Sequence, residues 1–170
     1  MMILSFVSKG GILLEYTTNQ SRCRRAEKLL EIQKICFAPH LQRYQDYETN
    51  PAMVSIDIIR WQIENENFYK IFADDIWVGS INLRKIDEET YKLHIINILP
   101  EYQGKGIGQA AIFASEKLFP HVKTWHLDTL EDMPQNRHVY EKVGYAFTGE
   151  TQVINEKLTL VFYRKDVIFP

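Results

Sequence analysis

The fold of this chain is set by one glycine-rich stretch, Gln103-Gly104-Lys105-Gly106-Ile107-Gly108, and by the segments on either side of it. The apolar, β-prone run 93–99 comes before it and is stopped by Pro100, and the run 109–118 after it reads as a helix. The first N–H groups of a helix lack internal partners, and the helix dipole favours negative charge there. Glycines let the chain turn sharply and let a phosphate approach the backbone. The stretch therefore predicts an anion-binding loop, to which Lys105 adds a positive charge, although glycines needed only for turning remain an alternative.

The glycine spacing separates the known kinds of phosphate loop. A P-loop needs Gly-x-x-x-x-Gly-Lys-Ser/Thr, whereas Lys105 is followed here by Gly106. A dinucleotide fingerprint needs G-x-G-x-x-G and an acidic residue about 20 positions further on. Gly104, Gly106 and Asp128 could supply part of that pattern, but the third glycine would have to be Gln109. Dinucleotide binding is therefore kept as an alternative.

Two motifs together carry a family resemblance. The segment 100–108 resembles the Q/R-x-x-G-x-G/A acetyl-CoA signature of the GNAT N-acetyltransferase superfamily, and the segment 134–145 resembles its second hallmark, a short helix ending in Tyr-Glu-Lys-x-Gly-Phe/Tyr. Both occur in the family's order and are separated by one predicted strand, 124–128. The resemblance covers about residues 95–150.

The pattern along the chain predicts a mixed α/β fold of the GNAT type in a single domain, residues 1–170. Helices are expected from Thr18 or Asn19 to Phe37, over 51–64, after the glycine turn, and over 135–143. Strands are expected over 12–16, 68–73, 76–83, 91–99, 124–128, 145–151 and 158–165, with a further short one within 1–7. We therefore expect a central, mostly antiparallel seven-stranded sheet with about four helices and one parallel pair, its fourth and fifth strands. The resemblance implies that this pair splays around the coenzyme.

The resemblance also implies which residues bind acetyl-CoA. The backbone of one strand would pair with pantetheine, and the glycine loop would hold the diphosphate. The expected coenzyme-binding residues are Ile96, Asn97, Ile98, Gln103, Gly104, Lys105, Gly106, Ile107, Gly108, Gln109, Asn136 and Tyr140. One departure is Met133, which stands where most family members have an asparagine.

Acetyl transfer to an amine needs a neutral amine and a proton for the departing thiolate. Neutralising a lysine-like amine at pH 7 costs roughly 4–5 kcal/mol. By resemblance, Tyr140 is the general acid, and a phenol stays protonated at neutral pH. Asp128 is the expected general base, with Glu131 and His94 as alternates. The alternative to turnover is a module that senses acyl-CoA or has a structural role.

Composition and net charge limit the classes of partner that we expect this protein to bind. The net charge of −2 and the lack of a basic run argue against nucleic acid, and no apolar stretch approaches the ~20 residues of a membrane span. Cys23 and Cys36 should lie about 20 Å apart on one helix, too far for a disulfide, so a cytoplasmic setting is expected. No metal is expected, because His121 and His126 have no further ligands at a sensible spacing.

The acceptor is expected to be an amine of a small molecule or a peptide. In the family, the first two helices and their loop line the acceptor side. This chain offers there Tyr44, Asp46, Tyr47, Trp61 and Glu64, which would suit a cationic amine. A monomer and a homodimer are both compatible with the sequence.

Overall fold

A computed structural model describes residues 5–7, 11–16 and 22–167 of the 170-residue chain. Its strands are β1 (Ser5–Val7), β2 (Ile12–Tyr16), β3 (Asn67–Ala73), β4 (Ile76–Lys85), β5 (Thr90–Ile98), β6 (Thr124–Leu130), β7 (Ala146–Asn155) and β8 (Leu158–Asp166). Its helices are α1 (Arg22–Tyr44), α2 (Ile56–Asn65), α3 (Ile107–Lys117) and α4 (Pro134–Lys142), with short 3-10 helices η1 (Pro51–Met53) and η2 (Pro100–Tyr102).

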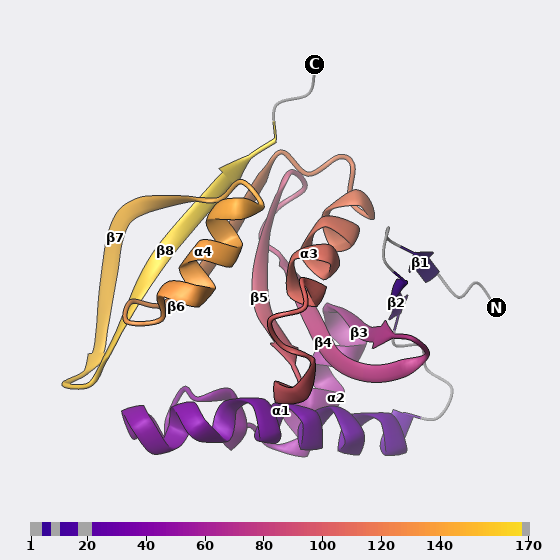
Figure 1. Ribbon diagram of the computed structural model, residues 1–170, viewed down its shortest axis with the longest axis horizontal. Helices are drawn as coiled ribbons and strands as arrows, with labels where there is room; N and C mark the ends of the chain where they lie inside the picture. The colour runs from indigo at the N-terminus through magenta and orange to yellow at the C-terminus, as the bar shows by residue number, and fades with distance from the viewer. Residues whose placement is uncertain (1–4, 8–10, 17–21, 168–170) are drawn as a thin grey trace.

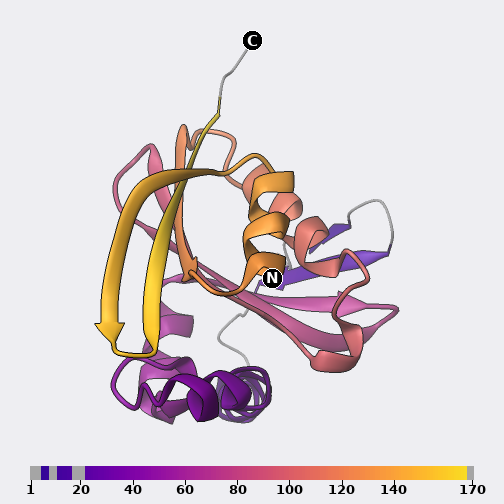
Figure 2. The same ribbon diagram turned by 60° about the vertical axis from the view of Figure 1, so that its left-hand side comes forward.

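The strands form one twisted sheet in the order β1-β2-β3-β4-β5-β6-β8-β7 (Figures 1 and 2). Among the described strands, β5 and β6 are the parallel pair, and all other neighbours are antiparallel. The seven longer strands are the seven expected from the sequence, and the three-residue β1 at the edge lies within the further short strand expected over 1–7. The expectation of a mixed sheet with one parallel pair and four helices is therefore confirmed.

The helices cover both faces of the sheet. Figure 2 shows α1 and α2 below the sheet and α3 and α4 above it. A large apolar cluster joins the sheet to α3 and α4, and a smaller one, which includes Ala26, Ile59 and Phe68, joins it to α1 and α2. Burial of these two apolar faces holds the layers together.

The parallel pair is short. Strand β5 pairs with β6 only over Thr90–Lys92 and Thr124–His126, and beyond these residues the two strands separate. Strand β5 then continues to Ile98 in register with β4, while β6 continues to Leu130 in register with β8. Past Lys92, the edge of β5 that faces β6 therefore has no strand partner among the described residues.

The first helix differs from the sequence expectation. It was predicted to end at Phe37 because of Pro39, but α1 runs to Tyr44 with Pro39 inside it. A proline inside a helix costs about 3 kcal/mol, so the last turn needs tertiary anchors. Tyr44 is buried, and both Arg43 and Tyr44 bond to Asp132 in the loop before α4. The predicted start at Thr18 or Asn19 lies outside the described residues.

The single helix predicted over 51–64 is wrong, because two helices begin in that segment. The side chain of Asn50 accepts from the Ala52 N–H and starts the short η1, and the hydroxyl of Ser55 accepts from the Ile58 N–H and starts α2. Each capping side chain satisfies an N–H that the helix itself leaves free. Elsewhere the predicted ranges agree apart from end shifts, the largest in β7, which extends to Asn155 instead of 151.

Candidate active site

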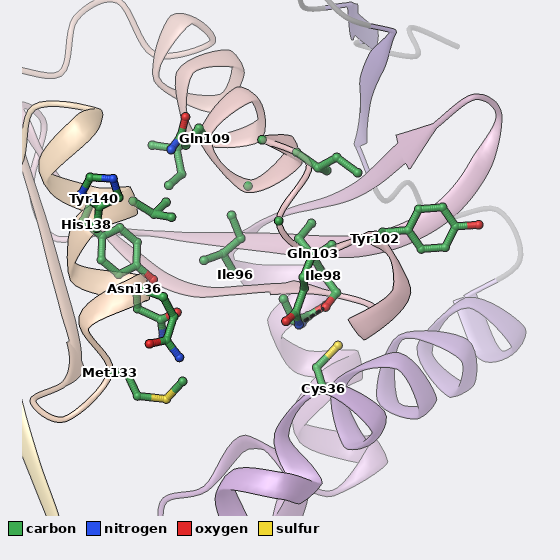
Figure 3. Close-up of a pocket in the computed structure, with 18 of the residues that line it drawn as sticks. Cys36, Ile96, Ile98, Tyr102, Gln103, Gln109, Met133, Asn136, His138 and Tyr140 are labelled. Atoms are coloured by element: carbon green, nitrogen blue, oxygen red, sulfur yellow. Dashed lines mark hydrogen bonds between the residues drawn. The ribbon is translucent and has the colours of Figure 1, made fainter.

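A cavity of about 460 Å³ opens where β5 and β6 separate. It lies between the end of β5, the glycine loop with the first turn of α3, one side of α4, and α1 (Figure 3). Most of the predicted coenzyme-binding residues line it: Ile96, Asn97, Ile98, Gln103, Gly104, Gly106, Ile107, Gly108, Gln109, Asn136 and Tyr140. The fold thus brings two motifs that are distant in sequence to one cavity.

The glycine loop has the conformation of an anion site. Gly104 and Gly106 have φ of 72° and 77°, in the left-handed region that favours glycine. Helix α3 begins directly after them, and its first backbone hydrogen bond runs from Ala110 N to the Gly106 carbonyl oxygen over 3.0 Å. As at any helix start, the N–H groups that precede this bond have no partner in the helix, so they are available to an anion.

Gly108 needs a reason other than backbone angle, because its φ is not left-handed. A Cβ added there would meet nothing within 4 Å, and Gly108 lines the cavity. Its missing side chain therefore leaves space on the cavity side of the first helical turn, where a diphosphate would approach. The residues present fit a coenzyme A diphosphate.

Two polar residues of the loop have local partners. Gln103 donates from Nε2 to the carbonyl oxygen of Ile98 at 2.8 Å, which fixes the loop against the end of β5 (Figure 3). The Lys105 ammonium lies 5.0 Å from the centre of the Tyr102 ring. Lys105 does not line the cavity, in contrast to the other predicted loop residues.

The end of β5 presents backbone to the cavity. Asn97 is buried, and its side chain exchanges hydrogen bonds with Ser80 on β4, so its amide group already has partners within the sheet. Ile96, Asn97 and Ile98 are paired to β4 on one edge only. Their other edge is the one that β6 leaves, which suits a ligand that pairs through amides.

Tyr140 lies between this cavity and a second one that it also lines. It is 9% exposed on α4. Burial raises its pKa to about 12, helped by the charge of Asp128 and opposed by a hydrogen bond with Thr129. The phenol therefore carries its proton across the neutral range. Figure 3 shows the Tyr140 ring beside Ile96 and Asn136.

The second cavity, of about 520 Å³, is called here the acceptor chamber. It is bounded by α1, η1, α2, the middle of β5, the end of β6 and the start of β8. Five residues line both cavities, namely Phe37, His40, Ile96, Asn136 and Tyr140. The two cavities therefore adjoin at Tyr140.

Of the three candidate general bases, Asp128 and His94 line the acceptor chamber and Glu131 does not. Asp128 was expected at the end of its strand, but β6 continues to Leu130 because it pairs with β8. Asp128 lines the acceptor chamber and forms an ion pair with Lys92, which the sequence reading missed. His94 also lines the chamber, and burial together with the charge of Arg84 lowers its pKa to about 4, so its ring is neutral. Glu131 lines neither cavity.

The predicted acceptor side is partly in place. Tyr44, Asp46 and Tyr47 line the chamber, whereas Trp61 and Glu64 do not. Asp46 is occupied by its own turn, since its carboxylate accepts from the N–H groups of Glu48 and Thr49. The Tyr44 hydroxyl donates to Asp132 at 2.6 Å.

Several lining residues were missed from the sequence. They are Cys36, Tyr102, Met133, Gln135, His138 and Val139 in the first cavity, called the coenzyme cavity from here on, and Gln33, Asn50, Gln62 and Lys92 in the acceptor chamber. Lys92 could have been found, because it lies two positions before His94 and shares its face of the strand. Gln62 carried a weaker signal, a polar residue between the apolar Ile59 and Ile63 on one helical stripe.

No group of three or more His, Cys, Asp or Glu among the described residues could hold a metal ion. No helix in this part of the chain is both long and apolar enough to cross a membrane.

Comparisons with known proteins agree with this architecture. A GNAT acetyltransferase of Elizabethkingia anophelis with acetyl-CoA bound is 17% identical, with a TM-score of 0.63 over 94% of this chain and 100% of that one. RimL, a ribosomal α-N-protein acetyltransferase in complex with coenzyme A, is 15% identical, with a TM-score of 0.71 over 95% and 97% of the two chains. A spermidine N-acetyltransferase chimera from Vibrio cholerae SpeG and hSSAT is 17% identical, with a TM-score of 0.69 over 92% and 95%.

At these identities the solved structures establish the fold alone. No curated protein matches the chain significantly. The sequence profile of the Acetyltransferase (GNAT) family, however, matches residues 26–145, well over half of the chain. This chain therefore belongs to the GNAT acetyltransferase family.

Proposed function

We propose that this protein transfers the acetyl group of acetyl-CoA to a primary amine by direct attack in a ternary complex. The observation that carries the proposal is the junction of two cavities at Tyr140, one suited to coenzyme A and the other open to an amine. The names of similar structures, a spermidine and a ribosomal-protein acetyltransferase, support an amine acceptor. One sheet with all four helices packed on it supports a single domain over residues 1–170.

The chain's residues would hold the coenzyme mainly through backbone groups. The N–H groups at the start of α3 would bind the diphosphate, and the free edge of β5 would pair with pantetheine. A charge-assisted hydrogen bond contributes roughly 1.5–3 kcal/mol, so three or four such N–H groups are enough for a diphosphate without a metal. Gln103 keeps the loop in position through its bond to Ile98.

Tyr140 would act as the general acid. When bound, acetyl-CoA supplies a thioester whose carbonyl carbon an amine can attack. Tyr140 donates its hydroxyl proton to the departing sulfur, and its raised pKa ensures that the proton is present.

Asp128 would receive the proton of the amine, directly or through water. It lines the chamber next to Tyr140's hydrogen-bond partner Thr129 and lies on the part of β6 that has left β5. Its negative charge also attracts an ammonium into the chamber. His94, whose neutral ring also lines the chamber, is the alternative base; Asp128 is preferred because its charge acts directly on the Tyr140 phenol.

The test has two stages. Calorimetry should show coenzyme A binding to the purified protein, and thiol release from acetyl-CoA over a panel of amines should then be slower in Tyr140→Phe than in the unmodified protein. Binding without release for any amine would favour a sensor of acyl-CoA. Thermal stabilisation by NAD and none by coenzyme A would favour dinucleotide binding.

A further inference from the structure

Negatively charged side chains outnumber positively charged ones in the lining of the acceptor chamber. Three carboxylates line it, those of Asp46, Glu48 and Asp128, and the one permanent cation among its lining residues, all of which the structure describes, is Lys92. Lys92 is already paired with Asp128. His40 and His94 add no positive charge near neutral pH, because burial lowers the pKa of each. The chamber therefore attracts a cation and has no cation left for an anionic group.

The mouth of the chamber is apolar. Tyr47, Met53 and Ile58 line it and are 63%, 50% and 48% exposed. Deeper inside, Leu93 and Leu158 are buried lining residues. Large apolar side chains that surround a cavity and remain exposed indicate a surface that a ligand covers. The body of the acceptor should therefore be apolar.

Two lining residues, Gln62 and Asp128, have a buried side-chain oxygen without a hydrogen-bond partner among the described residues, and that of Asp128 is ion-paired with Lys92. Gln62 on α2 is 5% exposed, and its Oε1 has no hydrogen-bond partner among the described residues. A buried carbonyl oxygen without a partner is rare in a folded protein, and a ligand is one explanation for it. The partner that Oε1 needs is an N–H or O–H donor.

That donor is not the reacting amine. Helix α2 packs on α1 and β3, whereas α4, which carries Tyr140, packs on α3 and β6. Figure 1 shows α2 and α4 in different parts of the molecule, and Gln62 and Tyr140 line the chamber from these two helices. A ligand that reaches both must carry its donor at the far end from its amine.

We propose that the acceptor is a primary amine on an apolar body, with one hydrogen-bond donor at the distal end and no anionic group, and that Gln62 binds this donor. The proposal rests on the proposed function and specifies its substrate class. Gln62 is a specificity residue under this proposal, and it takes no part in the chemical step.

The experiment compares four probes with coenzyme-bound protein. Tyramine has an aromatic body and a distal hydroxyl, 2-phenylethylamine lacks the hydroxyl, 4-methoxyphenylethylamine keeps the oxygen without its hydrogen, and tyrosine adds a carboxylate to tyramine. We expect kcat/KM for tyramine to exceed that for either donor-free amine by about 10-fold. Tyrosine should be at least about 100-fold worse, because its carboxylate meets like charge and no free cation.

Substitution of Gln62 separates recognition from folding. Gln62→Met keeps the side-chain length and removes the carbonyl, so the ratio of kcat/KM for tyramine to kcat/KM for 2-phenylethylamine should fall to about 1. The melting temperature should stay the same or rise, because an unpaired buried group is gone. Trp61→Leu is the matched control on the same helix, since Trp61 is 55% exposed and lies outside the chamber, and its ratio should remain about 10. Calorimetric titration of the coenzyme A complex with tyramine and with 2-phenylethylamine gives the corresponding ratio of Kd values without turnover.

Each result that contradicts these expectations would overturn a specific part of the proposal. Equal kcat/KM for tyramine and 4-methoxyphenylethylamine in the unmodified protein would overturn the role of Gln62. Tyrosine as the better substrate, or no turnover of any of the four probes while coenzyme A binds, would overturn the proposed substrate class. Failure to bind coenzyme A at all would instead remove the proposed function itself.

Discussion

The coenzyme cavity and the acceptor chamber are built in different ways. Under the proposed function, the coenzyme cavity would bind its ligand mainly through backbone groups of two short segments that line it, the glycine loop and the end of β5. The acceptor chamber is lined by side chains from six or more elements, including α1, α2, β5, β6 and β8. A ligand bound by backbone constrains a few adjacent residues to be glycine, whereas a ligand bound by side chains constrains residues that are distant in sequence. The two regions should therefore respond differently to substitution, and Tyr140 between them should affect only the chemical step.

The largest effect is expected for Tyr140→Phe. Loss of the general acid should lower kcat/KM by about 100-fold or more, while the Kd for coenzyme A, measured by calorimetry, stays unchanged. Tyr91→Phe is a suitable control, because Tyr91 is buried among Phe119 and Trp125 and lines neither cavity. A comparable loss in the control, or a weakened coenzyme affinity in Tyr140→Phe, would show that the phenol acts through packing.

A smaller and pH-dependent effect is expected for Asp128→Asn. Loss of the carboxylate should lower kcat/KM for the amine by about 10-fold or more at pH 7, because proton removal and ammonium attraction are both lost. The deficit should shrink as the pH approaches the pKa of the amine, since more of the amine is then neutral. Steady-state rates between pH 7 and 10 test this. A deficit that stays constant over that range would exclude Asp128 as the base.

Gly108→Ala should act on the coenzyme side alone. Alanine is favoured over glycine in a helix by up to about 1 kcal/mol, and an added Cβ meets nothing in the protein, so the melting temperature should not fall. The Kd for coenzyme A should nevertheless rise by about 10-fold, because the methyl group occupies the space of the diphosphate. An unchanged Kd would mean that the diphosphate does not approach this turn.

The smallest effect concerns stability in acid. His94 has a pKa of about 4 in the folded protein, because burial and Arg84 disfavour its charged form, against about 6.5 when unfolded. Between these values the unfolded chain binds more protons, so stability is complete above about pH 6.5 and falls as the pH decreases towards 4. The loss should be at most about 3 kcal/mol. Denaturant unfolding at pH 4.5 and 7 should show a smaller difference for His94→Gln, and an identical difference would place the acid sensitivity elsewhere.

The parts of the fold that were predicted correctly carry strong local patterns. The strands β3, β4 and β5, the helix α3 and the helix α4 lie within a few residues of their predicted ranges. The errors lie where tertiary contacts outweigh local preference. Helix α1 passes through Pro39 because its last turn is anchored to Asp132, and the segment after Asn50 divides because Ser55 starts a second helix.

The same distinction holds for the site. The glycine loop and Tyr140 were identified from adjacent residues, and the fold places both at one cavity. The Lys92–Asp128 ion pair, the unpaired carbonyl of Gln62 and the neutral state of His94 depend on which elements lie side by side, so no local motif contains them.

The sequence by itself determined the glycine turn, its helix and the short motif around Tyr140, because backbone angles and hydrogen-bond spacing act over a few consecutive residues. Only the tertiary structure decided where β5 and β6 separate, and with it the two adjoining cavities and the charges of the acceptor chamber. Burial and ion pairing depend on distances in space, and the packing of the whole chain sets those distances.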